Sequence, residues 1–179
     1  MPTFPPESGL IVSLPDGAWF RFQDCATYRR LNGRSLKEMD FGYWHEVHHC
    51  IFLLELKDYF ISPRTLPTDL VSELVDKGRH ALLMMHAAWQ GKGEGGALAA
   101  ELPEGCRRET PLQLKFVLKL RREEVPQLGT LQSAIRLPVL VYADLLGLTA
   151  SVQILDHERA IARGLPLADA SLPGPPMRG

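Results

Sequence analysis

The chain has 179 residues, of which 45% are hydrophobic and 23% charged, and its 20 basic and 21 acidic residues give a formal net charge of −1. This size and composition are typical of one ordinary globular domain, and the near-neutral charge excludes a protein that binds nucleic acid through a strongly basic overall field. No apolar run reaches the roughly 18 residues that a membrane span needs.

Two hairpins are predicted in the first third of the chain. LIVSL (10–14) and WFRFQ (19–23) flank the turn sequence Pro-Asp-Gly, which predicts that these two segments pair. MDFGYW (39–44) and the apolar run over residues 49–57 predict a second hairpin, with its turn near residues 47–48.

A helical segment is predicted after each of the two hairpins. CATYRRLNG (25–33) predicts one or two helical turns. A long helix is predicted from Thr68, because PTDL supplies a proline and a polar cap and an apolar stripe of 3.6-residue period continues to Trp89. GKGEGG (91–96) ends this helix and predicts a loop that extends to about Arg108.

The second half of the chain predicts strands alternating with helices. PLQLKFVLKLRR (111–122) alternates as a half-exposed strand, with its leucines and phenylalanine inside and Gln113, Lys115, Lys119 and Arg121 outside. Residues 125–148 have a mainly helical pattern, although Pro138 breaks or kinks the helix and VLVY (139–142) is an alternative short strand.

The last elements define the expected domain. SVQIL (151–155) predicts a strand and DHERAIARG (156–164) a capped short helix. We expect a single domain over residues 1–163 and a Pro-rich, poorly ordered tail over 164–179. The order of elements predicts an α/β or α+β fold, in which helices flank a mixed β-sheet.

A charged pair interrupts the apolar strand at 49–57. Glu55 and Lys57 are two residues apart in LLELKDYF, so both side chains point to one face of the sheet. A charge buried in a sheet costs several kcal/mol unless it is paired or bound. If the second hairpin turns as predicted, Asp40 lies opposite Glu55 and within reach of it.

Two carboxylates on neighbouring strands are suited to a hard divalent cation. Carboxylate oxygens are ligands that Mg²⁺ and Mn²⁺ prefer. A lysine on the same face could orient or deprotonate a metal-bound water and offset charge on a phosphate. Asp40, Glu55 and Lys57 are therefore the candidate site residues.

These residues resemble the motif of the PD-(D/E)xK, or restriction-endonuclease-like, nuclease superfamily. Asp40 in KEMDFGYW, fourteen intervening residues, and then Glu55-Leu56-Lys57 reproduce its pattern, and a helix follows from Thr68 as in the family. The resemblance covers roughly residues 10–122 and implies a restriction-endonuclease-like core.

The resemblance also implies ligands and roles. Asp40, Glu55 and the backbone carbonyl of Leu56 would bind Mg²⁺ or Mn²⁺, and Lys57, with the two acids, would be catalytic. Many members donate a further acid from a first helix, for which Glu7 and Asp24 are the candidates here.

The expected function is metal-dependent hydrolysis of phosphodiester bonds in nucleic acid, with DNA favoured over RNA. A homodimer or a subunit of a larger defence or repair system is expected by analogy. Cys25, Cys50 and Cys106 form neither a disulfide framework nor a zinc pattern, and MPTFPPESG lacks the features of a secretory signal. A cytoplasmic location without membrane contact is therefore expected.

Several alternatives stay open. Glu55 and Lys57 could form an ordinary ion pair on an exposed edge strand, and the chain could be a catalytically inactive interaction protein that keeps the nuclease fold. HEVHHC (45–50) resembles a metal cluster, although a polar hairpin turn is favoured. Lys77 could reach the active centre from its helix, or be a surface lysine.

Overall fold

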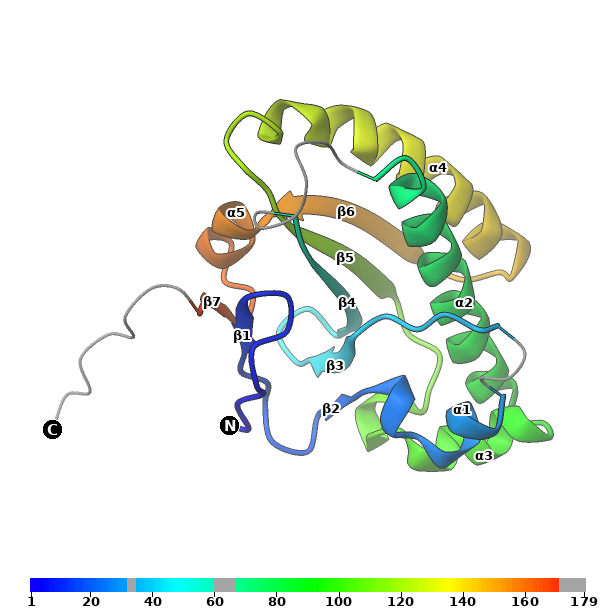
Figure 1. The fold of residues 1–179 in the computed structure, drawn as a ribbon. Helices are drawn as coiled ribbons and strands as arrows, with labels where there is room; N and C mark the ends of the chain where they lie inside the picture. Colours follow the sequence, from blue (N-terminus) through cyan, green and yellow to red (C-terminus); the bar gives the residue numbers. More distant parts are fainter. Residues whose placement is uncertain (32–34, 60–66, 171–179) are drawn as a thin grey trace, which may run out of the picture.

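The computed structural model describes residues 1–31, 35–59 and 67–170. A five-stranded sheet lies at its centre, in the order β2 (Trp19–Phe20), β3 (Phe41–His45), β4 (Cys50–Asp58), β5 (Leu112–Lys119) and β6 (Ala150–Asp156) (Figure 1). β2, β3 and β4 are antiparallel neighbours, whereas β4, β5 and β6 are parallel. The predicted fold class, a mixed sheet flanked by helices, is confirmed.

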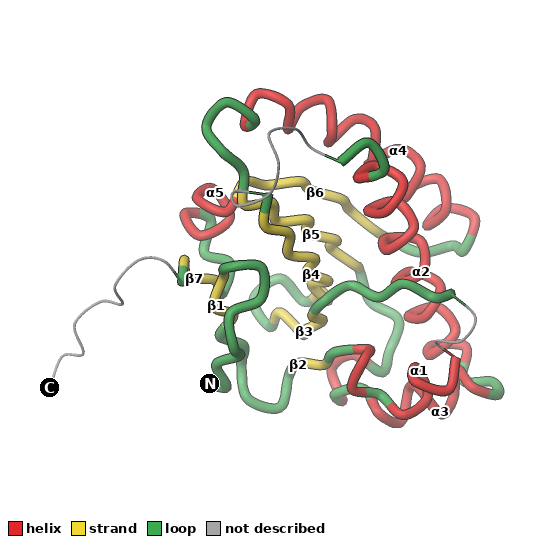
Figure 2. The backbone as a smooth tube through the Cα atoms, viewed as in Figure 1, coloured by secondary structure: helices red, strands yellow, loops and turns green. Residues whose placement is uncertain are grey.

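Different elements cover the two faces of the sheet. The long helices α2 (Leu70–Gln90) and α4 (Leu128–Leu145) lie along one face, and Figure 2 shows them as the outer layer beside the strands. The other face packs against a small antiparallel sheet of β1 (Leu10–Val12) and β7 (Leu167–Asp169), and against α5 (His157–Ala162). Each face therefore has its own apolar core.

Short helices complete the structure. α1 (Ala26–Leu31) and α3 (Glu94–Glu101) are in contact near the C-terminal end of α2 (Figure 1). Glu101 accepts hydrogen bonds from the backbone N–H groups at the start of α1, which satisfies donors that a helix N-terminus leaves unpaired. The short 3₁₀ turns are η1 (Phe22–Asp24), η3 (Glu104–Cys106) and η4 (Val125–Gln127).

The second hairpin and the long helix form as predicted. β3 and β4 are joined by a turn over residues 46–49, and Phe41 pairs with Leu54. α2 ends at Gly91, whose positive φ of 65° is a conformation that glycine adopts without the strain that a Cβ would cause. α1, β6 and the capped α5, where Asp156 accepts from the Arg159 N–H, also agree with the sequence.

The predicted first hairpin is wrong. The turn at Pro15 exists, since the Ala18 N–H donates to the Pro15 carbonyl, but the segments that it joins enter different sheets. β1 pairs with β7, which is more than 150 positions away in the sequence, and β2 pairs with β3. Leu10, Val12 and Leu14 are fully buried in the second core, so burial of that face decided the pairing rather than the local turn.

The prediction that β5 is half exposed is also wrong. β5 lies between β4 and β6 and both of its faces are covered, so Lys115 and Lys119 are 6% and 7% exposed. Lys115 donates to the Gln153 side chain, and Lys119 pairs with Asp169 of β7. These two lysines, which were expected to face solvent, are buried with partners because the small second sheet and α5 cover that face.

Two further elements differ from the sequence predictions. The loop expected over 91–108 contains α3, which buries Leu98 and brings Gly95 against the backbone of α2. α4 continues through Pro138, so the alternative strand at 139–142 is wrong. The carbonyl that loses its helical donor there belongs to Ala134, which is exposed, so water can satisfy it.

The domain extends beyond residue 163. Part of the expected tail forms β7, which pairs with β1, while residues 171–179 lie outside the described residues. Within the described part of the chain, no helix combines the length and apolar character that crossing a bilayer requires.

The close packing of α3 on α2 predicts the effect of a single methyl group. A Cβ at Gly95 would lie 2.1 Å from the Ala87 backbone carbonyl oxygen, which cannot move without bending α2. Gly95→Ala should lower the free energy of unfolding by about 1–3 kcal/mol, as overpacking does. Gly129→Ala in α4, where a Cβ meets nothing within 4 Å, is the control and should leave stability unchanged or raise it. Equal effects of the two substitutions in urea titrations would contradict the packing of α3.

Candidate functional site

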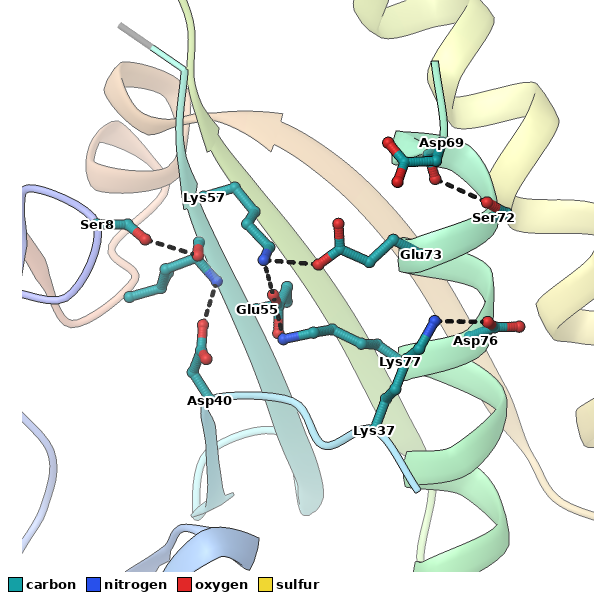
Figure 3. A network of polar contacts seen from close by, with 11 residues as sticks. Ser8, Lys37, Asp40, Glu55, Lys57, Asp69, Ser72, Glu73, Asp76 and Lys77 are labelled. Atoms are coloured by element: carbon teal, nitrogen blue, oxygen red, sulfur yellow. Dashed lines mark hydrogen bonds and ion pairs between the residues drawn. The ribbon is translucent and has the colours of Figure 1, made fainter. Parts of the chain in front are cut away.

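Asp40 lies at the N-terminal end of β3, beside residues 55 and 56 of β4. Asp40 directly precedes β3, and the register of Phe41 with Leu54 continues to place Asp40 opposite Glu55. The Asp40 Oδ2 atom accepts a hydrogen bond of 2.7 Å from the Leu56 N–H (Figure 3). A backbone donor thus holds the Asp40 carboxylate beside β4.

The unequal lengths of the strands create this arrangement. β4 continues to Asp58, beyond the first paired residue of β3, so the backbone groups of Leu56 have no partner strand on that side. Asp40 takes the N–H, and the Leu56 carbonyl accepts from the Ser8 hydroxyl at 2.9 Å. The Asp40 carbonyl in turn accepts from Arg21 Nε at 3.2 Å.

Glu55 is a fully buried carboxylate on the face that α2 covers. Its side chain is 0% exposed, and its Oε1 atom lies 2.7 Å from Lys77 Nζ and 3.5 Å from Lys57 Nζ. Both ion-pair distances are measured to Oε1, and neither buried oxygen of Glu55 has a hydrogen-bond partner among the described residues. The Oε2 atom is therefore a buried acceptor for which the described residues supply no hydrogen-bond donor.

Burial and a like charge destabilise the ionised form of Glu55. Loss of solvent, and then the charge of Asp40, raise the pKa of Glu55 to about 8, although Lys77 and Lys57 oppose the shift. Burial also raises the pKa of Asp40, while the hydrogen bond from Leu56 lowers it. Both carboxyl groups therefore bind a proton more readily than exposed ones, and for Glu55 the charge of Asp40 contributes to this.

Lys57 is held between two acids. Its Nζ atom lies 2.7 Å from Glu73 of α2 and 3.5 Å from Glu55. Burial lowers the pKa of Lys57, but the contacts with Glu73 and Glu55 outweigh it and the net pKa is raised. Burial likewise raises the pKa of Glu73, but the hydrogen bond and charge of Lys57, together with the charges of Lys77 and Lys37, outweigh it, so the net pKa is lowered.

The alternative of an ordinary ion pair on an exposed edge strand is wrong. β4 is the middle strand of the sheet and Glu55 is buried completely. Lys57 keeps a 26% exposed side chain, so it is accessible from outside while its partner is not.

Two residues of α2 complete the site. The sequence left open whether Lys77 is a site residue or a surface lysine. Its side chain is 15% exposed and forms an ion pair with Glu55, so the prediction of a surface lysine is wrong. Glu73 stands in no motif that marks it as a functional residue. The available signal was its place one helical turn before Lys77, on the border of the apolar stripe that faces the sheet.

A hollow of about 460 Å³ lies beside these residues. Glu73 and Lys77 line it, together with Lys37, whose Nζ atom pairs with Asp76 at 2.8 Å (Figure 3). Glu55 itself does not line the hollow. The α2 side chains thus connect the buried carboxylate to an open, mainly charged surface.

The donor set fits a hard divalent cation held by few protein ligands. The unused buried oxygen of Glu55, the carboxylate of Asp40 and the carbonyl of Leu56 are all oxygen donors, as Mg²⁺ prefers. No group of three or more His, Cys, Asp or Glu side chains with metal-binding geometry occurs among the described residues. A cation here would therefore keep several waters.

The candidates for a further acid occupy different positions. Glu7 pairs with Arg21 at 3.3 Å, and its charge contributes to the raised pKa of Asp40, so it lies on the Asp40 side of the site. Asp24 lies in η1, where its carbonyl accepts from Arg29.

The histidine cluster forms a hairpin turn. His45 ends β3, Cys50 begins β4, and the His45 and His48 rings stack with centroids 4.4 Å apart. The His45 Nδ1 atom accepts from the His48 N–H. The polar-turn interpretation is confirmed, and among the described residues no group of three metal-binding side chains occurs here.

Comparisons with family models, with curated proteins and with solved structures find no match to this chain. The functional interpretation therefore depends on the geometry and chemistry of the site itself.

The raised pKa of Glu55 predicts a pH-dependent loss of stability. Because the folded pKa of about 8 exceeds the usual value of 4.5, folding takes up a proton between these two pH values. The stability that this provides is complete below about pH 4.5 and is lost as pH rises through about 8. Glu55→Gln removes this dependence.

In chelator, the stability of the wild type relative to Glu55→Gln should therefore fall by about 1 kcal/mol or more between pH 5 and 8.5. Urea unfolding at both pH values measures it, with exposed Glu104→Gln as the control. A constant difference between wild type and Glu55→Gln would show that Glu55 is not destabilised as a carboxylate.

Proposed function

We propose that this protein is a metal-dependent nuclease that hydrolyses phosphodiester bonds in nucleic acid, with DNA as the favoured substrate. The observation that carries the proposal is the buried Glu55 carboxylate, which faces Asp40 and Lys57 and has an oxygen without a partner. This arrangement supports the resemblance to the PD-(D/E)xK superfamily.

Each residue has a distinct role in this proposal. Asp40, Glu55 and the Leu56 carbonyl would hold Mg²⁺ or Mn²⁺, which supplies Lewis acidity and a more acidic bound water. Lys57, on the same face as Glu55 and partly exposed, would orient that water and stabilise charge that builds on the phosphate. The Leu56 N–H keeps Asp40 aimed at the site.

The α2 side chains would act as counter-charges while no cation is bound. Lys77 neutralises Glu55, and Glu73 holds Lys57. Both residues also line the hollow, so each has open space into which its side chain can turn. In the proposed active state, Lys77 leaves Glu55 to the cation and faces the substrate.

A second candidate is an interaction protein that keeps the nuclease fold without catalysis. The contact of 2.7 Å between Lys77 and Glu55 favours it, because an ammonium group already supplies a positive charge at the candidate metal site. The two proposals differ in whether a divalent cation replaces that ammonium group.

The first test is metal binding. Mn²⁺ should bind the wild type weakly, as expected of a site that keeps several waters, and Asp40→Asn should abolish the binding heat. Because Glu55 must lose its proton, apparent affinity should rise by up to about tenfold per pH unit below pH 8. Calorimetry in buffers of different ionisation heat measures both effects. Equal heats from wild type and Asp40→Asn would rule out this metal site.

The second test separates catalysis from binding. Lys57→Ala should lower cleavage of plasmid and single-stranded DNA by about a hundredfold or more, since a preorganised donor to the transition state is lost. DNA affinity should change far less, because one phosphate contact among several contributes little to it. Exposed Lys92→Ala is the control and should cleave like the wild type.

The cleavage assay compares Mg²⁺, Mn²⁺ and chelator, with melting curves to show that Lys57→Ala is folded. Full activity of Lys57→Ala would place the active centre elsewhere. A wild type that cleaves no substrate with either metal would favour the interaction protein.

A further inference from the structure

A groove follows the open edge of the sheet, away from Glu55. β6 is the last strand in the sheet order, and a groove of about 420 Å³ runs along its residues 151–155. Three arginines line it: Arg136 of α4, Arg159 of α5, and Arg163 directly after α5. No acidic side chain is among the described residues that line this groove.

Two of the three arginines have no acidic partner among the described residues. Arg159 Nε pairs with Asp156 at 3.2 Å, whereas Arg136 and Arg163 are exposed and form no ion pair with any described residue. Guanidinium groups present several donors in a fixed plane that matches the geometry of phosphate oxygens. The groove therefore offers unused donors of the type that phosphate binds.

A buried lysine lies next to this edge. Lys115 of β5 is 6% exposed and donates to Gln153 Oε1, a groove residue, at 2.6 Å. Burial lowers the pKa of Lys115, and the nearby charge of Arg163 lowers it further. Since the whole chain carries a net charge of only −1, the positive charge here is local.

The backbone of β6 is not available to a partner strand. The Gln132 side chain of α4 accepts from the Ile154 N–H at 2.7 Å and donates to the Val152 carbonyl at 3.0 Å. These are outward-facing groups that an added β-strand would use. An acidic peptide could not extend the sheet here without displacing Gln132, whereas a ligand held by side-chain donors needs no edge backbone.

We propose that this groove binds the phosphodiester backbone of a nucleic-acid strand. The five residues of β6 that line the groove, at about 3.3 Å each, give it a length of about 16 Å, which spans several phosphates. The inference goes beyond the proposed hydrolysis, because the groove and the carboxylate site are separate and binding needs no metal.

The test measures binding in chelator, so that cleavage plays no part. Fluorescence anisotropy of a labelled single-stranded oligonucleotide compares wild type with Arg136→Ala/Arg163→Ala. The double variant should bind about tenfold or more weakly, and the slope of log K against log salt should fall by about 1.4, or 0.7 per lost phosphate contact. Both side chains are exposed, so the melting temperature should be unchanged.

A matched control removes the same charge elsewhere. Lys92→Ala/Arg108→Ala alters two exposed residues that do not line the groove, and it should bind like the wild type. An equal loss in both double variants, or no binding by the wild type at 50 mM salt, would overturn the proposal. The proposal would also be overturned if polyglutamate, at the same concentration of charge as the DNA, displaced the oligonucleotide. That result would indicate an acidic protein as the partner.

The outcome is independent of the nuclease test. The binding assay contains chelator and measures no cleavage, so a wild type that cleaves no substrate but still binds the oligonucleotide through the groove leaves this inference intact. A groove variant that binds normally overturns the groove assignment and leaves the metal site untouched.

Discussion

The contact between Lys77 and the buried carboxylate of Glu55 is the interaction on which the candidate site depends. A carboxylate that is 0% exposed is costly to ionise, and Asp40 across the sheet adds repulsion. Removing one partner of such a buried pair typically costs about 3–5 kcal/mol, while replacing both by apolar groups is often neutral. The pair is therefore a poor device for stability alone, and this is the physical reason to interpret it as functional.

The sheet and α2 together make the site possible. Alternation along β4 sends Leu54 and Leu56 into one core and Glu55 and Lys57 towards α2. β3 begins one residue after Asp40, which leaves the Leu56 backbone free to hold that carboxylate. Figure 3 shows how Lys77 and Glu73 reach back from one side of α2 to the two charges on β4.

Local patterns predicted most of the architecture and the position of the two acids. The β3–β4 hairpin depends on neighbouring residues, so the sequence could place Asp40 opposite Glu55. The β1–β7 pairing could not be predicted because it joins opposite ends of the chain. The same small sheet covers Lys119, so the sequence alone wrongly indicated that this lysine faces solvent. The roles of Lys77 and Glu73 could not be predicted. Both lie at the border of the apolar face of α2, and their contacts depend on how the helix packs on the sheet.

The central claim is that Asp40 and Glu55 form a divalent cation site that an ammonium group occupies in the metal-free protein. Anomalous X-ray scattering from crystals soaked with Mn²⁺ tests it most directly. We expect a manganese peak bounded by the Asp40 and Glu55 carboxylates and the Leu56 carbonyl, with Lys77 moved out of ion-pair distance from Glu55. Crystals without a peak at these oxygens, and with Lys77 still bonded to Glu55, would contradict the account.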